Sequence, residues 1–99
     1  MSNTEIKNKN FRINKNGDIE LCTGIKDAFG NLIYENDWIE STDQGERNKI
    51  IYDNKKKKLV CINRYGATFS IENEMSKNML NNYYFILKDS EMYDIDYKQ

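Results

Sequence analysis

Carboxylates are the most numerous side chains in this sequence that could do chemistry, and residues 27 to 46 hold six of them. Paired carboxylates can bind a divalent cation or act together as a general acid and base. Their spacing does not follow the order of a calcium-binding loop, and the chain has no histidine, the commonest metal ligand and general base. We interpret two of the six as turn-capping residues and the rest as solvated surface groups; in order they are Asp27, Glu35, Asp37, Glu40, Asp43 and Glu46.

The possible nucleophiles also lack a catalytic context. None of the four serines after residue 40 lies in a nucleophile elbow, and the five glycines form no phosphate-binding loop. Cys22 and Cys61 lie in strand-like segments without CxxC spacing, so we interpret them as small buried apolar residues. We expect no disulfide in a reducing cytosol. The sequence therefore predicts a protein that is not an enzyme and that uses no metal or cofactor; the serines are Ser41, Ser70, Ser76 and Ser90.

Basic residues gather in one stretch of the chain. Residues 49 to 68 carry six basic side chains and one acidic one, although the whole chain has a formal net charge of −1. Such a local patch could bind a phosphate backbone. A lysine-rich hairpin tip is also a common solvated turn, and no RNP or related nucleic-acid motif accompanies it. Nucleic-acid binding is therefore the alternative hypothesis, through Lys55, Lys56, Lys57, Lys58 and Arg64.

Aromatic residues are the second candidate for function. Seven tyrosines and one tryptophan are more than the interior of a small barrel holds, and both residue types anchor protein interfaces at low entropic cost. Ile39 is the better core candidate in its strand, so its neighbour Trp38 should point outward and be partly exposed. We predict a contact patch for a protein partner from these aromatics: Tyr34, Trp38, Tyr93 and Tyr97.

Length and composition set the class of protein. Ninety-nine residues allow one domain, and 22 of them are Leu, Ile, Val or Phe, enough for one compact core in a folded but polar domain. The apolar runs are too short to span a membrane, and no charged-then-apolar leader opens the sequence. We expect a cytoplasmic protein without a membrane partner; self-association is left open. The abundance of Asn, Lys and Ile fits an AT-rich bacterial or phage genome.

The elements that must position these residues are mostly short strands. Residues 11–14 and 19–22 alternate around an Asn-Gly turn and predict a first hairpin. A reversal follows at residues 26–31, where Asp27 can cap its own backbone and Gly30 accepts a positive φ. Residues 32–34 and 38–39 are the next strands. Asn36 tolerates the left-handed region between them, and Asp37 can bond the backbone two residues on.

The second half of the chain is predicted to hold a loop, three more strands and one short helix. Residues 41–48 hold no apolar side chain and predict a loop. Residues 49–53, 59–65 and 83–88 predict three strands. Ser70 could cap a short helix near residues 72–80, in which Ile71, Met75 and Met79 share a face and Asn81-Asn82 ends the helix. Residues 1–10 are expected to be a flexible segment, residues 11–99 one β-rich domain, and residues 89–99 a strand or a loose acidic tail.

The stretch from Thr23 to Ile39 carries a family resemblance. It reads Thr-Gly-Ile-Lys-Asp, Phe-Gly-Asn, Ile-Tyr-Glu-Asn-Asp and Trp-Ile, which resembles Thr-Gly-Leu-Lys-Asp, Asn-Gly-Lys, Ile-Tyr-Glu-Gly-Asp and Ile-Val of the YopX family of small phage and prophage proteins. Asn36 stands where the family has Gly, and Trp38 where it has a mid-sized aliphatic residue. The family's C-terminal pattern is replaced by residues 85–93.

Together these patterns predict a mainly β domain with one short helix, a small and strongly bent β-barrel that is SH3-like or YopX-like. The leading functional hypothesis is a non-catalytic phage or prophage accessory protein. It would bind a host protein or nucleoprotein complex in the host bacterial cytoplasm and inhibit a defence system in an anti-CRISPR-like or related manner. The resemblance, the small size, the lack of a catalytic set and the surplus of aromatics are its basis.

Overall fold

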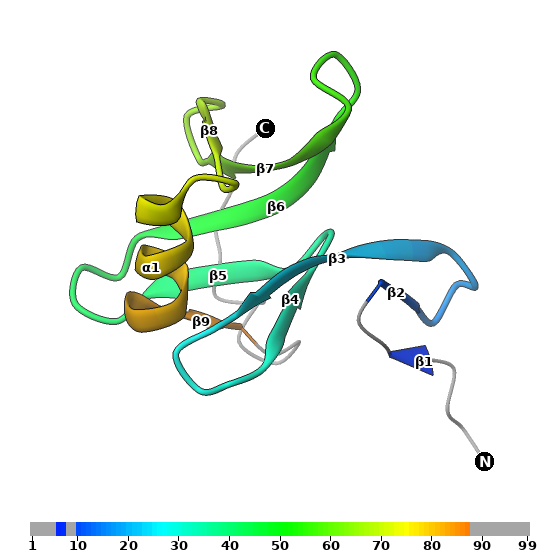
Figure 1. Ribbon diagram of the computed structural model, residues 1–99, viewed down its shortest axis with the longest axis horizontal. Coiled ribbons are helices and arrows are strands. Elements are labelled where there is room, and N and C mark those ends of the chain that lie inside the picture. The colour runs from blue at the N-terminus through cyan, green and yellow to red at the C-terminus, as the bar shows by residue number, and fades with distance from the viewer. Residues whose placement is uncertain (1–5, 8–9, 88–99) are drawn as a thin grey trace.

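The computed structural model describes residues 6–7 and 10–87, which form two antiparallel sheets and one helix (Figure 1). The first sheet has the order β1-β2-β3-β4, with β1 Ile6–Lys7, β2 Phe11–Ile13, β3 Ile19–Lys26 and β4 Leu32–Tyr34. The second has the order β8-β7-β6-β5-β9, with β5 Trp38–Ser41, β6 Arg47–Asp53, β7 Lys58–Asn63, β8 Thr68–Ser70 and β9 Tyr84–Ile86. The helix α1 is Glu74–Tyr83. The mainly β class is confirmed, and the described strands form no closed barrel.

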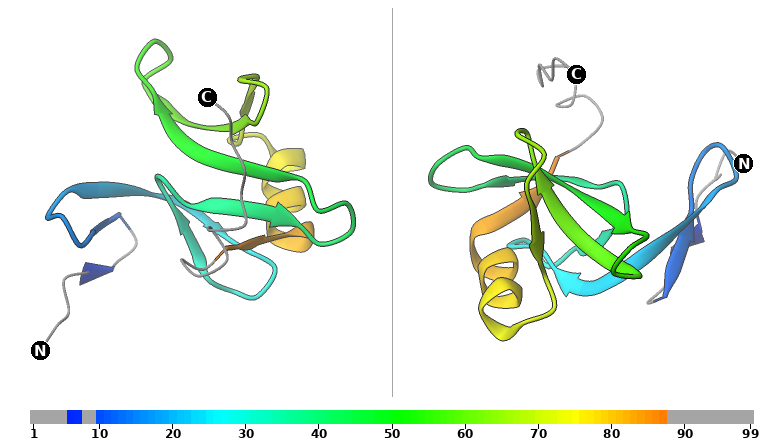
Figure 2. Two further views of the ribbon diagram at one scale, coloured as in Figure 1. Left: turned by 180° about the vertical axis from the view of Figure 1, so that it is seen from behind. Right: turned by 90° about the horizontal axis from the view of Figure 1, so that it is seen from above.

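The first half of the chain folds as its turn residues predict. Phe11 lies opposite Leu21 in the β2–β3 hairpin, which extends away from the rest of the molecule (Figure 1 and Figure 2). Asp27 caps its own turn by accepting hydrogen bonds from the backbone N–H groups of Phe29 and Asn31, both at 2.9 Å. Asn36 has φ +73°, as predicted for the turn between β4 and β5. Asp37 differs from prediction because it accepts from Tyr34 N, three residues earlier, at 2.8 Å.

The second half departs from the sequence prediction at three places. The strand β6 begins at Arg47 inside the predicted 41–48 loop, and Asn48 is buried. The strand β8 was not predicted. The helix begins later than expected because Asn73, not Ser70, accepts the capping bond from Ser76 N at 2.8 Å, and it runs through Asn81-Asn82. Ile71, predicted to share a face of the helix with two methionines, precedes the helix and is buried. Met75 and Met79 are exposed, and Leu80 is the buried residue of the helix.

The core lies between the two sheets and α1. Eight buried side chains, seven from different strands or their flanks and one from the helix, contact one another there. Ile33, Ile39 and Ile50 are fully enclosed, which confirms Ile39 as a core residue. Isoleucine suits these positions because its branched side chain packs well on a pleated surface. The cluster is Ile25, Ile33, Ile39, Ile50, Cys61, Ile71, Leu80 and Tyr84.

The chain ends bear on two of the predictions. Ile6 and Lys7, inside the segment predicted to be flexible, pair with Ile13 and Arg12 of β2. The predicted tail at residues 89–99 lies outside the described residues. Within the described residues, no helix is long and apolar enough to cross a membrane.

The turn at Gly30 offers a direct test of the backbone assignment. Gly30 has φ +87°, and a Cβ built there would meet no atom within 4 Å, so a substitution strains the backbone without causing a clash. We expect Gly30→Val to lower the free energy of unfolding by about 1 to 2 kcal/mol, because a β-branched residue disfavours positive φ. Urea denaturation measures this. Lys56→Ala, at an exposed hairpin tip, should change stability by less than about 0.5 kcal/mol. Equal midpoints for Gly30→Val and wild type would contradict the assignment.

Candidate functional site

The predicted aromatic contact pair does not form a surface patch. Tyr34 is 2% exposed, so its predicted role as an exposed contact residue is wrong. Trp38 is half-buried, as predicted, and Lys49 Nζ lies 5.5 Å from the centre of its ring. The other two predicted contact residues, Tyr93 and Tyr97, lie outside the described part of the chain.

Tyr34 is buried because it belongs to an ionic cluster at the junction of the two sheets. The guanidinium of Arg12 lies over its ring at 4.9 Å. Arg12 Nε donates to Glu20 Oε1 at 2.6 Å, and its Nη2 donates to Asp37 Oδ1 at 2.8 Å. Asn36 Nδ2 donates to the second oxygen of Glu20 at 3.0 Å. We call Arg12, Glu20, Tyr34, Asn36 and Asp37 the junction cluster.

The two carboxylates of the junction cluster respond differently to burial. Burial raises the pKa of Asp37, and this effect outweighs the hydrogen bond from Tyr34 N and the charge of Arg12, which lower it. Burial also acts to raise the pKa of Glu20, but the hydrogen bonds from Asn36, Arg12 and Asn14 prevail and lower it. Every oxygen of this pair is engaged within the cluster or with neighbouring backbone. The cluster therefore holds the β2–β3 hairpin against the β4–β5 turn and leaves no open coordination for a ligand.

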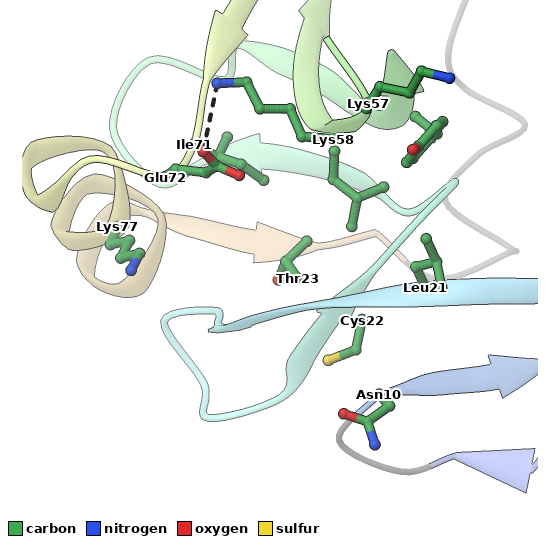
Figure 3. A pocket seen from close by; sticks show the side chains of 11 residues that line it. Asn10, Leu21, Cys22, Thr23, Lys57, Lys58, Ile71, Glu72 and Lys77 are labelled. Atoms are coloured by element: carbon green, nitrogen blue, oxygen red, sulfur yellow. Dashed lines mark hydrogen bonds and ion pairs between the residues drawn. The ribbon is translucent and has the colours of Figure 1, made fainter. Parts of the chain in front are cut away.

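The predicted lysines lie at the tip of the β6–β7 hairpin, and two of them border a groove. Lys57 and Lys58 line a cavity of about 680 Å³ together with Lys77 of α1 (Figure 3). The opposite wall comes from β3, which places Leu21 and Cys22 there (Figure 3). The groove thus lies between the two sheets. Its other lining residues are Asn10, Thr23, Tyr52, Leu59, Ile71 and Glu72.

The charges in this groove are only partly available to a ligand. Lys58 Nζ lies 3.4 Å from Glu72 Oε1, an exposed ion pair that contributes little to stability. Lys55 and Lys56 sit on the exposed turn outside the groove, where their backbone N–H groups donate to Asp53 Oδ1. The guanidinium of Arg64 lies 5.1 Å from the ring of Tyr65, in the turn that joins β7 to β8. The structure therefore brings Lys57 and Lys58 together with Lys77 and separates Arg64 from them.

A surface stripe of apolar side chains is the feature that sequence reasoning missed. Met75, Met79 and Tyr83 follow one another at four-residue spacing along α1, with 74%, 45% and 55% of their surfaces exposed. This spacing places them on one side of the helix. Phe69 of β8 is 51% exposed and lines the same cavity as Met79. We call Phe69, Met75, Met79 and Tyr83 the apolar stripe.

The four-residue spacing of the methionines was visible in the sequence and predicted that they share a face, but it did not show which face of the helix is buried. A helix that buries a stripe of methionines would leave Leu80 outside, whereas the structure buries Leu80 and bonds Ser76 Oγ to the carbonyl of Ser70 at 2.9 Å. A helix with one buried leucine has a weak apolar period, so the sequence could not decide between the faces. The available signal was that α1 contains three large apolar residues at spacing four and that Leu80 is out of step with them.

The cysteines and the acidic side chains are the remaining groups that could act as nucleophiles or as metal ligands. Cys61 is buried, and burial raises the pKa of its thiol to about 12, so the thiol is a poor nucleophile. Cys22 is half-buried, which differs from the predicted burial, and both cysteines are free. The described residues contain no group of three or more Cys, Asp or Glu side chains that could hold a metal ion.

Comparison of the chain with protein-family models, with curated protein sequences and with solved structures finds no significant match.

Proposed function

We propose that this protein is a non-catalytic binding module, an accessory protein of a phage or prophage that captures a host protein through the apolar stripe. The observation that carries the proposal is the exposure of four large apolar side chains on one helix and its neighbouring strand. Contiguous exposed apolar surface is uncommon on a soluble monomer and marks interaction sites. Methionine and aromatic side chains are also enriched at such sites.

The resemblance of residues 23–39 to the YopX pattern supports the phage or prophage origin. The same resemblance supports a finer description of the fold, in which the two sheets correspond to a strongly bent YopX-like or SH3-like barrel. An anti-CRISPR-like or related defence component is the class of target that we propose, because a small module without a catalytic set acts by occupying the surface of its partner. The cytoplasm of the host cell is the compartment in which that contact would form.

Affinity capture with matched variants tests this function. We expect tagged wild-type protein to retain a host protein from bacterial lysate, and Met75→Glu to lose it, because a buried unpaired carboxylate opposes docking of an apolar surface. Ile19→Glu is the control, since Ile19 is 63% exposed but is the first residue of β3, in the β2–β3 hairpin that extends away from α1 (Figure 1). Circular dichroism checks that all three proteins are folded. Retention of the same host protein by Met75→Glu, or no retention by folded wild type, would contradict the proposal.

The groove between the sheets favours a second candidate function, binding of nucleic acid. Three lysines and the half-buried Tyr52 line it. Lysines that neutralise phosphates make binding weaken by roughly one unit of log–log slope per phosphate contact as salt rises. Fluorescence anisotropy with labelled single-stranded and duplex oligonucleotides measures this slope for wild type and for Lys57→Gln. No binding at about 50 mM salt, where such contacts are strongest, would exclude this candidate.

A further inference from the structure

A second, smaller cavity lies beneath the apolar stripe, between α1 and the five-stranded sheet. The helix covers one face of that sheet (Figure 2). The cavity has a volume of about 170 Å³. Ligand pockets for drug-sized molecules usually measure about 300 to 1,000 Å³, so this cavity suits a single side chain or a few waters. Its lining consists of Glu46, Asn48, Cys61, Phe69, Ser70, Ile71, Ser76, Met79, Leu80 and Tyr84.

The floor of the cavity holds an unsatisfied hydrogen-bond acceptor. Asn48 is 5% exposed, and its Oδ1 is buried without a hydrogen-bond partner among the residues that the structure describes. A buried polar atom without a partner costs about 1 to 3 kcal/mol. Asn48 points to the cavity because alternate residues of β6 face the core, and Ile50 is the next inward residue. The protein therefore retains an acceptor in a place where a donor from outside would be favourable.

A carboxylate stands at the mouth of the same cavity. Glu46 lies in the loop that ends at β6, and its Oε1 accepts a hydrogen bond from the Tyr84 hydroxyl at 3.3 Å. Burial and the Glu46 carboxylate raise the pKa of Tyr84 to about 12, while the Asn48 amide acts in the opposite direction by hydrogen bonding to the phenol oxygen. This arrangement uses the N–H₂ group of Asn48 and the O–H of Tyr84. It leaves Asn48 Oδ1 and the carboxylate of Glu46 as acceptors.

The walls of the cavity are apolar and aromatic. Phe69 and Met79, both members of the apolar stripe, line it together with the buried Leu80. A ligand that fits must therefore combine an apolar stem with a head that carries hydrogen-bond donors and positive charge. A guanidinium group does so, because it is planar and weakly hydrated, offers several donors in a fixed fork and stacks on aromatic faces. A lysine ammonium is a compact, strongly hydrated charge and matches these walls less well.

We propose that this cavity is a pocket for one arginine side chain of the protein partner, with the guanidinium bound by Glu46 and Asn48 Oδ1 and the alkyl stem between Phe69 and Met79. This proposal rests on the proposed function, since the pocket opens within the apolar stripe and adds an arginine anchor to it. Arginine is among the residues that most often carry the binding energy of an interface.

Two small probes of the same shape test the pocket without knowledge of the partner. N-acetylarginine methylamide and N-acetylcitrulline methylamide differ in their head groups, a charged guanidinium and a neutral urea. They are titrated into the full chain labelled with ¹⁵N, and the backbone amides of Cys61 and Leu80 and the side-chain amide of Asn48 are followed by NMR. We expect saturable shifts at these three positions with the arginine probe, in the millimolar range, and at least tenfold weaker binding of the citrulline probe.

A pair of variants tests the charge at the mouth. Glu46→Gln should weaken binding of the arginine probe at least tenfold and leave the citrulline probe unchanged. Glu74→Gln should alter neither, because Glu74 is exposed in the first turn of α1 and does not line the cavity. The amide spectrum of each variant reports whether it is folded. Equal binding of the two probes, shifts elsewhere on the surface, or no saturable shift with the arginine probe would overturn the pocket, and the last result would mean that only water occupies it.

The probe titration tests the arginine pocket and the affinity capture tests the proposed function, so either one can give a negative result without the other. If the arginine probe binds but no host protein is retained, the pocket stands and the proposed function falls. If a host protein is retained through Met75 while the two probes bind equally, the arginine pocket falls and the proposed function stands.

Discussion

Replacement of Arg12 by methionine is expected to lower the free energy of unfolding by about 3 to 5 kcal/mol, the cost of breaking a buried ion pair from one side. Arg12 is the cation of the junction cluster, and its side chain is 14% exposed between Glu20 and Asp37, which are 7% and 8% exposed. Without it, two buried carboxylates face each other with no compensating charge. This loss would be a large share of the about 5 to 15 kcal/mol that stabilises an ordinary domain. Chemical denaturation followed by Trp38 fluorescence measures it.

Arg47→Met provides the matched control for Arg12→Met. Arg47 Nε donates to Glu40 Oε1 at 2.7 Å, nearly the same geometry, but this pair is 29% and 22% exposed and lies on neighbouring strands. Solvent screens such a pair, so we expect a loss below about 1 kcal/mol. Similar losses for the two variants would contradict a special role for the junction cluster.

The pH dependence of Arg12→Met follows from the same cluster. Arg12 lowers the pKa values of Glu20 and Asp37, so its removal raises both in the folded state. A carboxyl group whose folded pKa lies above its unfolded value favours folding below the unfolded pKa, and this contribution is lost as pH rises through the folded pKa. The stability difference between wild type and Arg12→Met should therefore narrow as pH falls from 7 towards about 4, where carboxyl groups take up protons.

Local chemistry in the sequence was sufficient to predict the turns. Asp27, Gly30 and Asn36 each adopt the role that their residue type favours, because a turn is decided by a few neighbouring backbone groups. The hairpins follow from alternation around those turns, and Ile39 was recognisable as a core residue for the same reason. These are interactions between residues close in the sequence, which a single sequence records.

Contacts between distant segments could not be predicted in this way. Tyr34 is buried because Arg12, 22 positions earlier in the chain, lies over its ring, and no local pattern announces that pairing. The exposure of Met75 and Met79 depends on which side of α1 packs against the rest of the domain. That side is the one that carries Leu80, the buried residue of the helix. The unsatisfied oxygen of Asn48 follows from the start of β6 inside a segment that has no apolar residue. The candidate site could therefore be identified only from the three-dimensional arrangement of these distant segments.

Asp27 joins the two kinds of interaction, and its removal is the second change from which we expect a large effect. Its Oδ1 caps its own turn, while its Oδ2 accepts a hydrogen bond at 3.0 Å from the backbone N–H of Ile86, 59 residues away in β9. Ala28 N donates to the carbonyl of Tyr84 at 2.8 Å beside it. One carboxylate thus fastens the β3–β4 turn of the first sheet to the edge strand of the second.

Asp27→Ala should lower the free energy of unfolding by about 2 to 4 kcal/mol. The change leaves three backbone N–H groups, those of Phe29, Asn31 and Ile86, without their acceptor. Each such donor costs about 1 to 3 kcal/mol where water cannot replace the acceptor, and water can reach only some of these three groups. Asp27→Asn should recover part of the loss, because one amide oxygen can still accept while the amide nitrogen opposes a donor. Asp53→Ala is the control: Asp53 also caps a turn, and its donors, Lys55 N and Lys56 N, belong to that same turn. Its Tm should stay close to that of wild type.

Hydrogen exchange separates the two roles of Asp27, because Asp27→Ala should speed exchange at Ile86, whereas Asp53→Ala should not. Unchanged protection of Ile86 in folded Asp27→Ala would show that the link between the sheets does not depend on this carboxylate.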